Sequence, residues 1–145
     1  MWQLDKLVGG GIPADVYRYA GDDHPAKMQE ELLIFGWQLY YLDGRLANDK
    51  DSFIRELGAA LAAPAYAGRN WDALEEVLRD LSWDRNQGYI LLYEYAQRFA
   101  ENDPQGWRTA LSILRNACRF WAEQGTPMYV LLRRVDGALE ETAML

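Results

Sequence analysis

The sequence offers little for a catalytic or metal site, since it holds one cysteine, Cys118, and one histidine, His24. A single cysteine excludes an intrachain disulfide and a thiolate metal cluster, and it is typical of reducing compartments. Cys118 lies on an apolar helical stripe and His24 stands beside Pro25 in another segment, which does not favour a cysteine–histidine pair. We therefore expect no enzyme activity, no metal and no cofactor.

Long apolar runs are also missing. No stretch of eighteen apolar residues is present, and the first eleven residues carry Asp5 and Lys6 inside their apolar part, unlike a signal peptide. The run Gly9-Gly10-Gly11 lacks the following Gly-Lys-Ser/Thr of a phosphate loop. These features predict a cytoplasmic protein without a membrane span.

Positive charge is in short supply, because the formal net charge is −7. The excess is −3 over residues 1–42, −4 over 43–94 and 0 over 95–145. An acidic surface repels the phosphate backbone, and no basic, aromatic-rich stripe offsets this. Direct binding of nucleic acid is therefore not expected, whereas a basic protein partner is electrostatically favoured.

The 145 residues are half hydrophobic, which suits one domain with a sizeable core. Residues 15–20 alternate, and residues 36–42 are aromatic-rich up to the Asp43-Gly44 turn, so both segments are predicted to be strands. Between them, the spacing of Met28, Leu32 and Phe35 predicts a short helix over 25–35. A right-handed crossover would then join two parallel strands in a βαβ unit.

The remaining chain continues this alternation. Asn70 is typical of a helix N-cap, and Asp103-Pro104 is typical of a cap followed by proline in the first turn. The predicted order is a helix from about 51 to 64, a loop over 64–69, a helix from 70 to about 83, a central strand over 88–93, a long helix over 103–125, a strand over 127–134 and an acidic tail over 135–145. The fold class expected is α/β, with a parallel sheet of three to four strands packed with helices.

The stretch Pro64-x-Tyr66-x-Gly68-x-Asn70-Trp71-Asp72-Ala73-Leu74, with Trp83 downstream, resembles the barstar family of intracellular inhibitors of the ribonuclease barnase. The order of elements agrees as well. The resemblance implies a single domain in which a barstar-like core over 37–134 carries an N-terminal βα extension over 1–36 and the tail over 135–145.

The resemblance also implies a function, namely that the loop and the following helix enter the basic active site of a toxin-like or extracellular-type ribonuclease or other nuclease. The partner-binding residues implied are Tyr66, Gly68, Asn70, Asp72, Glu75 and Glu76. Three positions depart from the family pattern. Glu75 replaces a tryptophan, Arg69 replaces an acid, and Arg119 or Phe120 falls where the long helix would supply a glutamate. We expect a monomeric, antitoxin-like inhibitor.

A simpler interpretation of these residues is also available. Asp72 stabilises a helix N-terminus through the macrodipole alone, and Glu75 stands four residues before Arg79 as an ordinary surface pair. Asn70 is a cap under either interpretation, and Trp71 is better explained as core. The alternative function is a barstar-fold interaction or scaffold module for a partner that is not a nuclease.

Overall fold

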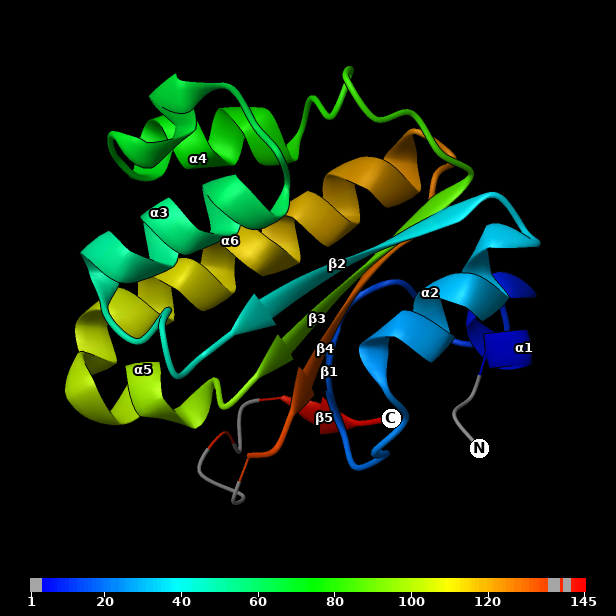
Figure 1. Ribbon diagram of the computed structural model, residues 1–145, viewed down its shortest axis with the longest axis horizontal. Helices are drawn as coiled ribbons and strands as arrows, with labels where there is room; N and C mark the ends of the chain where they lie inside the picture. The colour runs from blue at the N-terminus through cyan, green and yellow to red at the C-terminus, as the bar shows by residue number, and fades with distance from the viewer. Residues whose placement is uncertain (1–3, 136–138, 140–141) are drawn as a thin grey trace.

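The computed structural model of the chain describes residues 4–135, 139 and 142–145. Its centre is a five-stranded sheet in the order β2-β3-β4-β1-β5, and every neighbouring pair is parallel (Figure 1). The α/β fold and the parallel sheet are confirmed, and the tail adds a short fifth strand. The strands are β1 Val16–Tyr19, β2 Trp37–Asp43, β3 Gly88–Glu94, β4 Met128–Arg133 and β5 Ala143–Met144.

Helices cover both faces of this sheet (Figure 1). One face carries α1 Leu4–Val8 and α2 Pro25–Leu33. The other carries α3 Lys50–Ala60, the 3₁₀ helix η1 Ala65–Gly68, α4 Trp71–Leu78, α5 Gln97–Asn102 and α6 Pro104–Glu123. No helix in the described part of the chain is long and apolar enough to cross a membrane.

The alternation of side chains along the strands builds two hydrophobic cores. Tyr89, Leu91 and Tyr93 of β3 belong to the core under α3–α6, whereas Ile90 and Leu92 belong to the core under α1 and α2. All seven residues of β3 and all six of β4 are buried. This explains the continuous apolar run of β3, which is an interior strand as predicted.

The N-terminal segment contributes a strand to the sheet and two helices to one of its faces. Strand β1 pairs with β4 in register from Val16↔Val130 to Tyr19↔Arg133. It is parallel to β2, as the βαβ prediction requires, but β3 and β4 lie between them. The core under α2 combines Leu7, Met28 and Leu32 with side chains of β2, β3 and β4. The extension therefore covers a face that the rest of the chain leaves apolar.

Three local predictions differ from the structure. Helix α4 ends at Leu78 instead of near Trp83, because the chain turns at Leu81, whose φ is 46°. Helix α5 was not predicted; it starts after Tyr95, whose φ is 60°. The weakly patterned tail contains β5 and two buried residues, Leu139 and Thr142. Residues 136–138 and 140–141 of that tail lie outside the described residues.

A buried ion pair joins the carboxyl ends of β3 and β4. The Arg133 Nε donates to Glu94 Oε2 at 2.9 Å, and the Arg134 Nε donates to the same oxygen at 2.6 Å. The Tyr41 hydroxyl donates to Glu94 Oε1 at 2.5 Å. Glu94 is 5% exposed and Arg133 is 1% exposed. The carboxylate is thus bound on both oxygens, as a buried charge requires.

Candidate partner-binding surface

The loop before α4 is held against the core from one side. Ala67 is buried and lies beside Gly58 of α3, where a methyl group on the glycine would be 3.6 Å from the Ala67 side chain. Tyr66 is half-buried and packs against the same core. Gly68 is exposed, and a side chain there would meet nothing within 4 Å. The described fold does not itself require glycine at 68, so the residue leaves room for an approaching molecule.

Helix α4 starts at a side-chain cap. The Asn70 Oδ1 accepts a hydrogen bond from the Ala73 N–H at 2.8 Å. Trp71 packs its ring against Phe53 of α3 with the centroids 5.9 Å apart, which agrees with its expected place in the core. Leu74, Val77 and Leu78 are fully buried below the helix. This apolar stripe leaves the opposite side of α4 in solvent.

Two of the three candidate carboxylates lie on that exposed side. Asp72 and Glu76 are exposed and four residues apart, so they share one helix face. Within the described chain neither forms an ion pair. Glu75 is half-buried, and its Oε1 lies 3.0 Å from Arg79 Nη2. The structure therefore brings Asp72 and Glu76 together as solvent-facing acids, while Glu75 has an intramolecular partner.

Two tryptophan side chains fix the ends of the helices behind this face. The Trp121 indole N–H, from α6, donates to the Leu78 carbonyl at 2.8 Å. The Trp83 indole N–H donates to the Leu61 carbonyl at 2.9 Å, at the end of α3. Both bonds satisfy carbonyl groups that a helix end leaves unpaired. Helix α4 is consequently held at its cap, along its apolar stripe and at its last turn.

A groove of about 610 Å³ separates the acidic helix from α6. Asp72 and Glu75 line one wall, and Arg108, Ser112 and Asn116 line the other. Arg108 and Asp72 share the groove without forming an ion pair in the described structure. Sequence analysis did not single out Arg108. Its regular spacing with Arg115 and Arg119 along α6 was the available signal.

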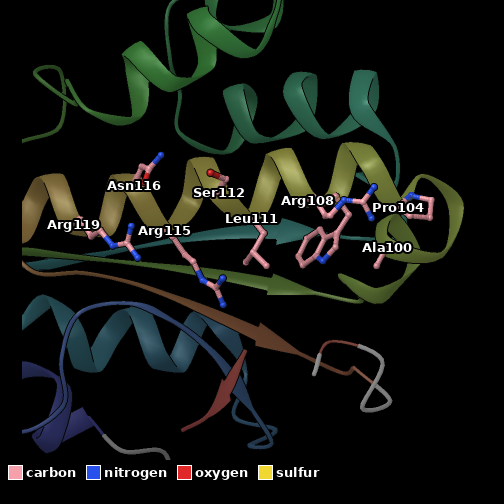
Figure 2. Close-up of a pocket in the computed structure, with 9 residues that line it drawn as sticks. Ala100, Pro104, Arg108, Leu111, Ser112, Arg115, Asn116 and Arg119 are labelled. Carbon is pink, nitrogen blue, oxygen red and sulfur yellow. The ribbon is translucent and has the colours of Figure 1, made fainter. Parts of the chain in front are cut away.

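The outer side of α6 carries a second hollow, also of about 610 Å³ (Figure 2). Its rim includes Arg108, Arg115 and Arg119, and its lining includes Leu111. Figure 2 shows Arg115 and Arg119 extending from one side of α6, while Ser112 lies on the side that faces α3 and α4. The surface around the acidic helix is therefore split in charge, acidic on α4 and basic on α6.

The structure does not bring the sequence's two reactive side chains together. Cys118 is buried in the core under α3–α6, and burial raises the pKa of its thiol to about 12. His24 caps α2, where its Nδ1 accepts a hydrogen bond from the Ala26 N–H at 3.1 Å. A thiol with such a pKa is protonated near pH 7 and is a weak nucleophile.

Replacing Asn70 by alanine should lower the free energy of unfolding by about 1 kcal/mol, because the first turn of α4 loses its side-chain acceptor. Asn70→Asp keeps an acceptor and should stay close to the wild type. Urea denaturation followed by circular dichroism measures both. Equal stability of the alanine variant and the wild type would show that the cap contributes nothing.

Comparisons with known proteins give a similarity of fold and a family match. The solved structures with similar folds include the ORC2 protein of Aeropyrum pernix in its ADP form and in ADPNP–ADP complexes, each at TM-score 0.62 and 15% identity. The match covers 94% of this chain but 40% of theirs. Cdc6p of Pyrobaculum aerophilum gives 0.48 at 14% identity, covering 96% of this chain and 39% of that one. These similarities concern the fold alone.

No curated protein matches the sequence. The sequence does match the family described as "Barstar (barnase inhibitor)", over residues 37–133. The matched region starts at β2 and ends with β4, so it contains η1, α4 and the acidic face but leaves out α1, β1, α2 and β5. The chain belongs to the barstar family, with an N-terminal βα segment inserted into the same sheet.

Proposed function

We propose that the chain is an antitoxin-like inhibitor that blocks the active site of a basic ribonuclease or related nuclease, acting in the cytoplasm as a monomer. The observation that carries the proposal is the pair Asp72 and Glu76, exposed and without ion-pair partners in the described structure, on a helix fixed from behind. Side by side at i and i+4, the two carboxylates repel each other and cost the helix a few tenths of a kcal/mol, about the effect measured for such pairs. Positive charges in a basic cleft would pair with both carboxylates and remove this repulsion, so the binding free energy would become more favourable.

The loop supplies a second contact in the proposal. Gly68 lets a partner's backbone approach η1 closely, and the half-buried Tyr66 stands two residues before it. Fixed acids also accelerate encounter with a cationic partner, and this acceleration falls as salt rises. Binding should therefore be tighter at low ionic strength.

Reversing both charges, in the double variant Asp72→Lys and Glu76→Lys, should weaken inhibition at least about a hundredfold, since each unpaired interfacial charge costs roughly 2 kcal/mol or more. The probes are purified barnase and a panel of microbial ribonucleases of the same type. Cleavage of a fluorogenic RNA is measured at low and at physiological salt.

The matched control is Glu30→Lys with Glu123→Lys, which changes the net charge equally at two exposed positions away from α4. It should inhibit like the wild type. If the wild type inhibits a panel enzyme and the α4 variant inhibits it equally well, the acidic face is not the binding site. If no enzyme of the panel is inhibited by the wild type, the nuclease proposal fails.

A second candidate is an interaction module for a partner that is not a nuclease. The observation in its favour is the charge split, because Glu75 is engaged by Arg79 and α6 presents Arg108 and Arg119 where a cationic enzyme would be repelled. Arg108→Glu with Arg119→Glu separates the two. The inhibitor proposal expects tighter inhibition of a basic ribonuclease by this variant, whereas the interaction module loses its partner.

A further inference from the structure

A pocket of about 430 Å³ opens at the carboxyl edge of the sheet, on the ends of β1 and β4. Strands β1 and β4 are parallel neighbours, so their carboxyl ends meet at this edge of the sheet. In open α/β sheets, ligands bind outside the carboxyl ends of the strands.

Three arginine side chains line this pocket, and each is oriented through its Nε. Arg18 donates from Nε to the Thr142 carbonyl at 3.0 Å, while Arg133 and Arg134 donate from Nε to Glu94. Arg133 also donates from Nη1 to the Asp23 carbonyl at 2.6 Å. Over the described residues, Arg133 Nη2 and both Nη atoms of Arg18 and Arg134 have no hydrogen-bond acceptor.

The lining of the pocket holds three guanidinium groups and the carboxylate of Asp22. Arg133 and Arg134 share the Glu94 carboxylate, and the Asp23 carboxylate accepts a hydrogen bond from the pocket-lining Tyr19 hydroxyl. Arg133 is 1% exposed, and its pairing with Glu94 holds its guanidinium in a fixed orientation. A guanidinium presents two parallel donors that match a carboxylate or a phosphate.

The first turn of α2 does not offer its N–H groups to the pocket. The Ala26 N–H bonds the His24 imidazole, and the N–H groups of Lys27 and Met28 bond the His24 carbonyl. Gly21 and Lys27 have the spacing of a phosphate loop, but Ala26 and Met28 stand where that motif requires Gly and Ser/Thr. The charged donors of this pocket are therefore the three arginine side chains.

We infer that this pocket binds a small oxyanion, a phosphate monoester or a carboxylate, through the Nη atoms of Arg18, Arg133 and Arg134. The volume falls in the range of small-molecule sites. The site lies at the end of the sheet and is built from β1 and β4, apart from η1 and α4. Its occupancy is independent of inhibition by the acidic helix.

The test is calorimetric titration of the full chain with inorganic phosphate, adenosine monophosphate and citrate. The variant is Arg18→Gln with Arg134→Gln, which spares the buried Arg133 that Glu94 needs. The matched control is Arg108→Gln with Arg119→Gln, which removes the same charge from α6. Thermal unfolding confirms that both variants fold.

We expect one saturable site in the wild type and in the α6 control, with about tenfold or greater loss of affinity in the pocket variant. Saturable binding of inorganic phosphate or adenosine monophosphate would identify the ligand as a phosphate. Saturable binding of citrate alone would identify it as a carboxylate. Amide shifts of Tyr19, Gly21 and Asp22 on titration of the wild type would locate it there without any substitution. Absence of saturable binding by all three probes, equal losses in both variants, or shifts confined to α6 would overturn the inference.

Discussion

A chain that begins at residue 37 is expected not to fold into a stable monomer, although it contains the whole family-matched region. Without β1, α1 and α2, one face of the sheet is uncovered. The side chains that lose their cover are Trp37, Leu39, Ile90, Leu92, Tyr129 and Leu131. Each large apolar side chain contributes about 1.5–3 kcal/mol when buried. Exposing six of them costs about 9–18 kcal/mol, which is comparable to the whole stability of a typical domain, about 5–15 kcal/mol.

The loss of β1 also leaves β4 as an edge strand, with unpaired backbone groups that favour aggregation. Circular dichroism and dye binding to exposed apolar surface measure the outcome for residues 37–145. Supplying residues 1–36 as a separate peptide should restore a cooperative transition. A cooperative transition of the truncated chain alone, near the midpoint of the full chain, would contradict the expectation.

This expectation decides how the function can be tested. A truncated chain that loses a partner reports unfolding and says nothing about whether residues 1–36 touch that partner. Point variants on exposed positions, such as Asp72 and Glu76, leave the sheet intact. They are the changes from which a binding surface can be inferred.

Replacing Glu94 by glutamine is expected to cost about 3–5 kcal/mol, because the buried Arg133 then has no counter-charge. The Tyr41 hydroxyl also loses its carboxylate acceptor. Arg134→Gln is the matched control, since that side chain is partly exposed to solvent and its pairing with Glu94 is screened, so its loss should matter far less. Urea denaturation at pH 7 measures both. Similar, small losses in the two variants would mean that the buried pair is not a principal contact.

The same residue predicts a pH dependence. Burial by itself would raise the pKa of Glu94, but the hydrogen bond from Tyr41 and the charges of Arg133 and Arg134 outweigh it, so the pKa in the folded protein is lowered. The stabilisation by ionised Glu94 is therefore complete above the unfolded pKa of about 4.3 and is lost as the pH falls through the folded value. Stability measured between pH 7 and pH 3 should fall more steeply for the wild type than for Glu94→Gln. Parallel curves would contradict this.

Features that depend on neighbouring residues were predictable from the sequence. Asn70 caps α4, and Asp103 caps α6 with Pro104 in its first turn, because a cap involves atoms only a few residues apart. The apolar run over 88–93 is an interior strand, since burial on both faces removes the alternation. The exposed side of α4 followed from the position of its apolar stripe.

Features that depend on residues far apart in the chain were not predictable. Strand β5 has two residues and exists through its pairing with β1, which no local pattern encodes. Arg108 and Asp72 lie on opposite walls of one groove, which exists because α6 packs beside α4. The pairing of Glu94 with Arg133 and Arg134 needs two strand ends to meet at one edge of the sheet.

The sequence by itself determined the types of the longer helices and strands, the helix caps, the negative charge and the acidic face of α4, because each depends on residue properties and spacing within a few turns or strands. Only the tertiary structure decided that residues 1–36 supply an interior strand, that the acidic face has a basic neighbour, and that three arginines meet over one pocket. Strand order and helix packing depend on the burial of apolar surface contributed by distant parts of the chain together. A pattern within a few neighbouring residues therefore does not predict them.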